Sequence, residues 1–259
     1  MATPDKPSPP AVRTIARESL TSKVYGELRA GLTEGRFWPG YRFKIRELAV
    51  AMKVSETPCR EALMQLVRER ALDMDAGRSL KAASLTLAQY LELRTVRLEL
   101  EGMAAEAATL HITSAQLAQV EKLHKALIKA ETLGDWPAAV RTNWLFHRAI
   151  YAAAQMPELL GLIEGIWLRN GPMLNLLYPD AAPRYDGHHQ HLAVIDGLRR
   201  CQPAQVRAAI QADMVEGGRG LVALLERIDR GEIDLPVRAA LPVAPAPAGR
   251  KKKSAPAQR

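Results

Sequence analysis

The sequence predicts a mainly α-helical protein, in which a small N-terminal domain precedes an antiparallel helical bundle. From residue 87 onward, apolar residues recur with a helical period in six successive segments, which Gly, Pro or Asp residues separate. No alternating, Val/Ile/Thr-rich strand interrupts these segments. The 259 residues, 47% of them apolar, suffice for two domains with their own cores. We therefore expect one domain over residues 19–86 and a helical domain over residues 87–228.

The distribution of charge points to an anionic partner of the first domain. The chain has a formal net charge of +8. Residues 19–86 contain 12 Lys and Arg against 8 Asp and Glu, whereas residues 87–228 contain 14 against 15. We expect residues 1–18 to form a flexible arm and residues 229–259, which are rich in Pro and Ala and include "RKKK", to form a disordered basic tail. Whether this tail binds anything is left open.

The sequence also limits the compartment and the class of site. No run of about 18 apolar residues is present to cross a bilayer, and the first residues lack an apolar signal segment. We therefore expect a cytoplasmic protein. The two cysteines, Cys59 and Cys201, lie far apart and form no CxxC pair, which argues against a zinc knuckle or a disulfide framework.

Two helices are expected before residue 54. In the first, Val24, Leu28 and Leu32 recur every four residues, and Gly35 follows as a helix stop before the turn "WPG". The second lies in "KIRELAVAMKV" and has apolar residues on one side. The segment "VSET" then turns the chain.

A third helix begins at Ser55, which is a suitable N-cap, and Pro58 falls in its first turn, where an N–H would lack an acceptor in any case. An apolar stripe follows, formed by Cys59, Ala62, Leu63, Leu66 and Val67. The residues left exposed near the helix N-terminus are Ser55, Glu56, Thr57 and Arg60.

Two helices joined by a short turn, with polar groups at the start of the second, match what insertion into a DNA major groove requires. The helix N-terminus favours phosphate, and Arg60 can pair with phosphate or guanine. Two short apolar pieces around Gly77 then indicate a hairpin or wing. The alternative is a helical hairpin whose exposed polar residues are merely solvated.

The segment "SKVYGELRAGLTEGRFWPGYRFKIRELAVAMKVSETPCREALMQLV" strongly resembles the winged-helix domain of the GntR family of bacterial transcription regulators, especially its FadR subfamily. The resemblance lies in "G.F.PG.R", "ELA" and "VS.TP.REAL..L". By position it implies that Arg46, Ser55, Thr57 and Arg60 contact DNA and that Gly77 lies in the wing.

Two positions depart from that pattern. Glu56 stands where the family commonly has arginine, and a carboxylate there repels phosphate but can accept from a cytosine amino group. We therefore expect Glu56 to alter the preferred operator. The wing, "AGRSLKAA", lacks a second glycine, and Arg78 is the residue that can supply a minor-groove contact.

The second segment contains a candidate metal site. Asn143 and His147 share one helix face, and His191 and Asp213 lie on the last two predicted helices. Two imidazoles, a carboxylate and an amide oxygen can hold a divalent ion with one open coordination position. The alternative is a set of hydrogen-bonded core residues. We interpret His124, which lies among lysines, as a surface residue.

"RLELEGMAAEAA", "NWLFHRAIY" and "HLAVIDGLRRCQPAQVRAAIQADM" resemble the FCD effector-binding domain that accompanies this winged helix. The resemblance implies an Asp and three His around a metal, beneath a pocket for a small carboxylate. Asn143 replaces the Asp and Asp213 replaces the last His, while His147 and His191 are retained. The implied ion is zinc, nickel or manganese, held more weakly than by the full set. His188 and His189 lie close enough in sequence to substitute.

The same resemblance places Arg97 near the pocket, where it can anchor an anionic effector by a bidentate bond. The alternative for Arg97 is a surface pair with Glu101, four residues on. Arg169 and Asn170 are further candidates for the pocket wall.

These patterns predict a homodimeric DNA-binding regulator that reads a palindromic operator and responds to a small carboxylate. The resemblance favours repression that the ligand relieves. One alternative keeps the regulator but has a metal-free pocket. Another is a metal-dependent hydrolase built on His147, His191 and Asp213. The sequence has no Gly-rich phosphate loop, GxSxG or HExxH, so we expect no enzyme.

Overall fold

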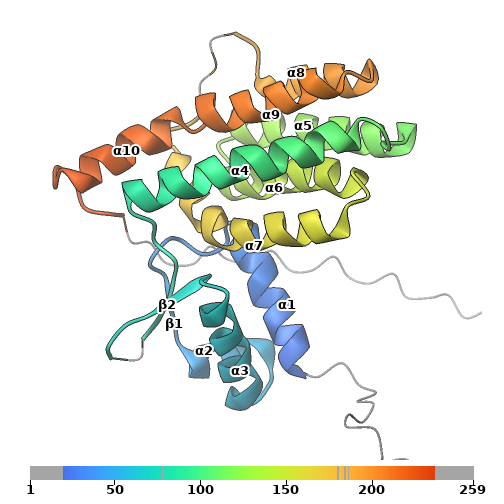
Figure 1. Ribbon diagram of the computed structural model, residues 1–259. Helices are drawn as coiled ribbons and strands as arrows, with labels where there is room; N and C mark the ends of the chain where they lie inside the picture. Colours follow the sequence, from blue (N-terminus) through green and yellow to red (C-terminus); the bar gives the residue numbers. More distant parts are fainter. Residues whose placement is uncertain (1–19, 78, 180, 184, 186, 237–259) are drawn as a thin grey trace, which may run out of the picture.

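The computed structural model describes residues 20–77, 79–179, 181–183, 185 and 187–236. The N-terminal arm (1–18), most of the basic tail and Arg78 lie outside the described residues. The mainly helical architecture predicted from the sequence is confirmed, with a small domain attached beneath a bundle of helices (Figure 1). No helix in the described part of the chain is long and apolar enough to span a bilayer.

The N-terminal domain has three helices and a small sheet. Its elements are α1 (Leu20–Thr33), β1 (Arg42–Phe43), α2 (Ile45–Met52), α3 (Glu56–Arg68), β2 (Leu72–Met74) and β3 (Leu80–Ala82). The strands are antiparallel in the order β1-β3-β2. The two strands β2 and β3 form the hairpin expected around Gly77. The short strand β1 was not expected from the sequence.

The core of this domain lies between α1 and α3. Leu28 and Leu32 of α1 and Leu63 and Leu66 of α3 are completely buried, as their four-residue and three-residue spacings predict. Replacing one of these leucines by alanine typically costs about 2–5 kcal/mol. The core therefore fixes the orientation of α3, whose opposite side faces solvent.

The helical domain follows after Ala83. Its elements are α4 (Leu87–Ala108), α5 (Ser114–Thr132), α6 (Trp136–Ala153), α7 (Pro157–Leu174), the 3-10 turn η1 (Asn175–Leu177), α8 (Gln190–Arg199), α9 (Pro203–Glu216) and α10 (Arg219–Asp229). Helices α4 and α5 begin with capping boxes, at Thr86 with Gln89 and at Thr113 with Gln116. The closest helix pairs are α5 with α6, α4 with α9 and α8 with α9.

The last predicted helical segment is divided in two. Residues 202–228 read as one helix, but Gly217 and Gly218 separate α9 from α10. A Cβ at Gly217 would lie 2.9 Å from the Tyr185 hydroxyl. Glycine at this position therefore lets Tyr185 approach the end of α9, where Asp213 lies.

The two domains meet through α1 and α7, which lie against each other in Figure 1. A Cβ at Gly171 would overlap the backbone carbonyl of Leu32, so only glycine permits this approach. Asn175 donates to the carbonyl oxygens of Gly35 and Phe37, at 2.8 and 3.2 Å. Gly171 and the side-chain amide of Asn175 together hold α7 and the following turn against the end of α1.

Nearer the start of α7, its contact with α1 is polar. Glu164 of α7 accepts from Arg29 of α1 at 2.9 Å and from Arg148 of α6 at 2.8 Å. Leu168 of α7, which is 1% exposed, joins the core of the N-terminal domain. One face of α7 therefore packs against the N-terminal domain.

Candidate functional site

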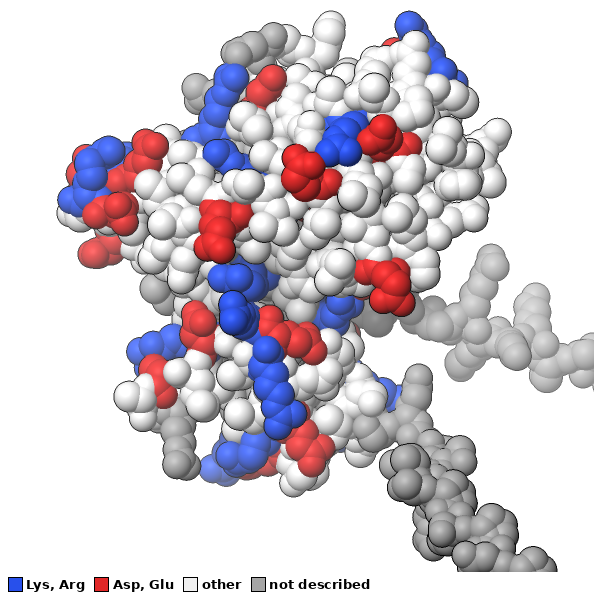
Figure 2. Space-filling view, in the orientation of Figure 1, with Lys and Arg blue, Asp and Glu red and all other residues white. Residues whose placement is uncertain are grey.

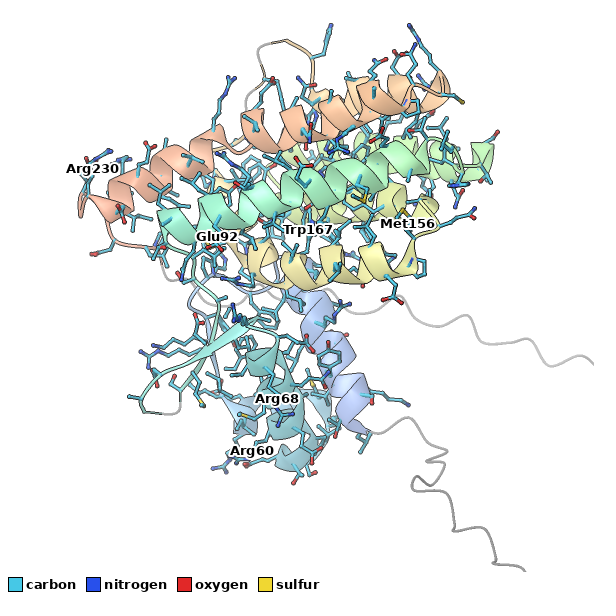
Figure 3. The ribbon with its side chains drawn as sticks, viewed as in Figure 1. Arg60, Arg68, Glu92, Met156, Trp167 and Arg230 are labelled. Atoms are coloured by element: carbon cyan, nitrogen blue, oxygen red, sulfur yellow. The ribbon has the colours of Figure 1, made fainter. Side chains whose placement is uncertain are left out.

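The start of α3 forms an exposed polar surface. Ser55 occupies the N-cap with an extended backbone, but its side chain makes no capping hydrogen bond. Glu56, Thr57 and Arg60 are also exposed, and Arg46 is exposed on α2. Figure 3 shows Arg60 at the end of the molecule farthest from the helical domain. The start of α3 therefore presents Ser55, Glu56, Thr57 and Arg60 to solvent.

Glu56 and Arg60 face each other across one helical turn. Arg60 Nη2 lies 3.9 Å from Glu56 Oε2, and the two side chains are 63% and 54% exposed. At this distance and exposure the pair contributes little to stability. Glu56 nevertheless sits beside the guanidinium that would contact DNA, so it can orient Arg60 as well as accept from a base.

The wing is held by acidic and basic groups at its base. Asp75 accepts from the backbone N–H of Ser79 at 2.8 Å, and Lys81 Nζ lies 3.0 Å from Asp75 Oδ2. Gly77 is exposed at the tip. Arg78, the predicted minor-groove residue, lies outside the described residues.

The helical domain contains a buried cluster of the predicted metal-site residues. His147 of α6, His191 of α8 and Asp213 of α9 are 2%, 0% and 7% exposed. Asp213 Oδ2 lies 3.3 Å from His147 Nε2 and 3.5 Å from His191 Nε2. Asn143, one turn before His147, lines the adjoining cavity. We call His147, His191 and Asp213 the first triad.

Neighbouring residues orient the first triad. Tyr185 donates its hydroxyl to Asp213 Oδ1 at 2.9 Å, and the Tyr151 hydroxyl lies 3.1 Å from His147 Nδ1. The ring of Phe146 stacks on His191 with centroids 3.7 Å apart. Second contacts of this kind fix the tautomer and the ring direction of a metal ligand.

Burial determines the protonation of the cluster. It lowers the pKa of His191 to about 3, so this imidazole is neutral at pH 7. Burial alone would raise the pKa of Asp213, but the neighbouring His191 and His147 rings hold it well below its usual range. The first triad therefore offers a carboxylate and an imidazole lone pair, which is the form of these groups that binds a metal. Zinc, nickel and manganese all accept such a donor set.

Beside the first triad, Arg97 is enclosed in a network of buried polar groups. Its Nε lies 2.6 Å from Glu101 Oε1, and its Nη1 donates to Asn170 Oδ1 at 3.0 Å. Glu101 also accepts from the Tyr151 hydroxyl at 2.6 Å and from Trp167 Nε1 at 3.0 Å. The pair anticipated at the surface is thus buried, and the charge of Arg97 is already neutralised by Glu101.

The space between these groups is small. A cavity of about 60 Å³ lies between the first triad and Arg97. Its wall includes Arg97, Glu131, Asn143, His147, Tyr178 and Asp213. By comparison, one ordered water requires roughly 10–15 Å³ on this measure. The cavity therefore accommodates an ion with a few waters, or a ligand of a few heavy atoms.

Arg169 and Asn170, the other predicted pocket residues, lie elsewhere. Arg169 lines a separate hollow at the junction of the two domains, together with Tyr25, Arg29 and Arg70. Asn170 is fully buried and contacts Arg97 instead of lining the cavity. The two residues are adjacent on α7, so they point in different directions around the helix.

One histidine of the cluster, His124, was misplaced by sequence reasoning, whereas His189 was anticipated as a possible substitute ligand. His124, interpreted as a surface residue, is 8% exposed, with its ring centroid 5.6 Å from that of His191. The sequence signal was its spacing from Val120 and Leu127, which are buried on the same face of α5. His189 is the N-cap of α8, where its side chain accepts from the backbone of His191. The neighbouring His188 is exposed.

Each of the two domains matches a known protein family. The family described as "Bacterial regulatory proteins, gntR family" matches residues 20–81, and the FCD domain matches residues 92–215. The HTH-type transcriptional regulator McbR of Escherichia coli (strain K12) is 33% identical over 202 residues, which cover 74% of this chain and 91% of that protein. The HTH-type transcriptional repressor NanR of an Enterobacter species (strain 638) is 26% identical over 78% of this chain and 85% of its own.

Solved structures show the same arrangement. The structure of E. coli McbR/YncC superimposes with a TM-score of 0.73 at 30% identity, covering 82% of this chain and all of that one. A putative GntR regulator from Rhodococcus sp. RHA1 has a TM-score of 0.64 at 18% identity, over 78% and 97% of the two chains, which supports the fold alone. The chain therefore belongs to the GntR family of bacterial transcriptional regulators, in which an HTH DNA-binding domain precedes an FCD domain, and it is a regulator and not an enzyme.

Proposed function

We propose that this regulator represses transcription as a homodimer on a palindromic operator, and that a small carboxylate bound over a divalent ion in the FCD domain releases it. The observation that carries the effector part is the first triad, in which two buried imidazoles and a carboxylate converge beside a small cavity. The DNA-reading part rests on the exposed start of α3.

In the reading step, α3 enters the major groove with its N-terminus first. Arg60 bonds a guanine or a phosphate, and Ser55 and Thr57 contact the backbone or a base edge. The Ser55 hydroxyl is well suited to this because no capping hydrogen bond occupies it. Arg46 on α2 contacts phosphate, and the wing around Gly77 and Arg78 reaches the adjacent minor groove.

A homodimer is supported by an apolar stripe on α4. Val96 and Met103 lie seven residues apart on α4 and are 45% and 43% exposed, and Leu110, in the turn that follows α4, is 71% exposed. Seven-residue spacing keeps side chains on one helix face. Figure 2 shows that the face carrying α4 has uncharged areas between acidic and basic groups. A second copy packed on this stripe would bury it and pair the two reading helices by two-fold symmetry.

The effector step depends on the ion because the cavity itself is acidic. Glu131 and Asp213 line it, while the charge of Arg97 is compensated by Glu101. A carboxylate would therefore meet net negative charge in the empty cavity. A divalent ion on His147, His191 and Asp213, with the Asn143 amide oxygen as a further ligand, would neutralise that charge and could leave a coordination position for the effector.

The signal would pass through α7. Trp167 and Asn170 on this helix contact Glu101 and Arg97 beside the cavity. Leu168 and Gly171 contact the N-terminal domain. An effector that favours one position of α7 would thereby favour one orientation of the reading helix, and coupling of this kind is reciprocal with DNA binding.

The first experiment is to measure metal content and thermal unfolding of the natively purified protein. Zinc, nickel and manganese are titrated into wild type and a His147→Ala/Asp213→Asn variant, first alone and then with a library of small carboxylates. We expect a rise in Tm with the ion in wild type, a further rise with one class of carboxylate only when the ion is present, and a smaller response in the variant. Carboxylate binding of equal strength without any ion would favour the alternative, a metal-free pocket.

A gel-shift assay with a selected operator links the two parts. The carboxylate that stabilises the loaded protein should weaken operator binding by the same factor by which DNA weakens carboxylate binding. An effector that binds without changing operator affinity would contradict the proposed coupling.

A further inference from the structure

Four of the six histidines of the chain gather in one region of the FCD domain. The ring centroids of His189 and His191 lie 4.2 Å apart, and that of His124 lies 5.3 Å from His189 and 5.6 Å from His191. His147 lies on the other side of the group, 5.1 Å from His191. His191 is therefore shared between the first triad and a second set of histidines.

We propose that His124, His189 and His191 form a second metal-binding site, alternative to the first triad and suited to Zn²⁺, Ni²⁺ or Cu²⁺. Imidazole is a preferred ligand for these ions, whereas Mn²⁺ prefers oxygen. This all-histidine set contains neither of the two altered positions, Asn143 and Asp213. It does not depend on the proposed carboxylate effector.

The geometry of the second set fits an ion after small rotations. One ring nitrogen from each of the three histidines lies within 4.8 Å of the others. In a tetrahedral zinc site with Zn–N distances of about 2.0–2.1 Å, ligand nitrogens stand about 3.3 Å apart. Closing this difference requires each ring to move by roughly an ångström, which side-chain rotation can supply.

Unpaired polar atoms point to a missing partner. Nδ1 of His191 and Nδ1 of His124 are buried and have no hydrogen-bond partner among the described residues, and Nε2 of His191 has only the Asp213 carboxylate at 3.5 Å. A buried nitrogen without a partner is unfavourable, and exceptions in native structures call for an explanation such as an unseen ion.

The two sites are alternatives because they share His191. Its Nε2 lies 3.5 Å from Asp213 Oδ2, on the side of the first triad, and its Nδ1 is the other ring nitrogen. A neutral imidazole has a lone pair on only one nitrogen. A neutral His191 therefore binds one ion at a time, so the two sites compete for it.

Binding at the second site also changes the start of α8. His189 Nδ1 accepts the backbone N–H of His191 at 3.1 Å, so its proton lies on Nε2 in the neutral ring. To bind an ion through Nε2, the ring must move this proton to Nδ1 and release the N-cap. An ion at the second site would thus loosen the first turn of α8.

The test compares two double variants of the full-length protein by zinc titration calorimetry and by metal content after dialysis. His147→Ala/Asp213→Asn removes the first triad and keeps the three histidines of the second. We expect it to retain close to one equivalent of zinc, and adding His124→Gln and His189→Asn should lower the affinity by about 100-fold or more. His189→Asn keeps a capping oxygen at the start of α8, so loss of the cap does not confuse the result.

Several controls keep the result interpretable. His188→Ala removes a neighbouring exposed imidazole and should bind zinc as wild type does. Circular dichroism and operator binding of each variant show that it is folded. If folded His147→Ala/Asp213→Asn binds no zinc, or if zinc binding persists after His124 and His189 are also replaced, the second site does not exist. The variant with only His124→Gln and His189→Asn tests the first triad separately.

Discussion

The polar residues at the start of α3 and those around Arg97 in the FCD domain differ in their access to water. At the start of α3, Glu56 and Arg60 are more than half exposed, and water satisfies them until DNA replaces it. In the FCD domain, Arg97 and Glu101 are 5% and 1% exposed and must satisfy each other. The exposed residues can therefore be chosen for DNA recognition with little effect on the stability of the fold. The buried residues affect both stability and effector binding.

The largest expected effect is the loss of a buried partner. Glu101→Gln should lower the free energy of unfolding by about 3–5 kcal/mol, because it leaves the Arg97 guanidinium buried without a counter-ion. Chemical denaturation measures this directly. The matched control is Glu99→Gln on the same helix. Glu99 pairs with Arg207 but is 67% exposed, so the free energy of unfolding should fall by less than about 1 kcal/mol. Equal losses in the two variants would remove the distinction between the two sets.

Arg60→Ala should do the opposite, with unchanged stability and weaker DNA binding. A lost base or phosphate contact costs about 1–3 kcal/mol at each half-site, so a dimer loses at least tenfold in operator affinity. Arg68→Ala is the control, because Arg68 is exposed near the other end of α3 (Figure 3). Fluorescence anisotropy with labelled operator separates the two. An affinity equal to that of wild type for Arg60→Ala would remove it from the reading surface.

Glu56→Arg should change which operator is preferred. The carboxylate can accept from a cytosine amino group, whereas a guanidinium in its place pairs with guanine, a difference worth about 1–3 kcal/mol at the contacted base. Selection of binding sites from a random library reads out the change. The same consensus from both proteins would show that residue 56 contacts no base.

Ser55→Ala should destabilise the protein less than the replacement of an N-cap serine usually does. Replacing an N-cap serine usually costs about 0.5–2 kcal/mol, but Ser55 makes no side-chain capping bond, so the loss should stay within about 0.5 kcal/mol. A modest loss of operator affinity would accompany it. A destabilisation of typical N-cap size would mean that the Ser55 hydroxyl caps α3 in solution and is less free for DNA.

The same difference in access explains what the sequence could predict. The apolar stripe of α3 and the exposed residues around it follow from spacing alone, because one helix determines them. The strand β1 is only two residues long, and its pairing with β3 depends on a partner about 38 residues away, so no local pattern marks it. The division of residues 202–228 occurs at Gly217 and Gly218, which the hydroxyls of Tyr185 and Tyr90 approach from other segments.

The buried set was predicted less completely. His147, His191 and Asp213 converge as expected, and this expectation came from their helix positions together with family resemblance. His124 stands among lysines in the sequence, yet α5 turns it inward toward α8. Arg97 and Glu101 were correctly paired by their four-residue spacing, but their burial depends on Trp167, Tyr151 and Asn170 from α6 and α7. Contacts among three or more helices are what a single sequence does not reveal.

The fit of α7 against α1 has a consequence for engineering. Gly171 allows the backbone of α7 to touch Leu32, and Asn175 donates to two carbonyls of the N-terminal domain. A chimeric biosensor made by joining this DNA-binding domain to the FCD domain of a distant relative would bring together surfaces that never evolved against each other. Transplanting the residues of α7 and η1 that contact the N-terminal domain, residues 164, 168, 171 and 175, along with that domain would carry the matching half of the contact into the new protein.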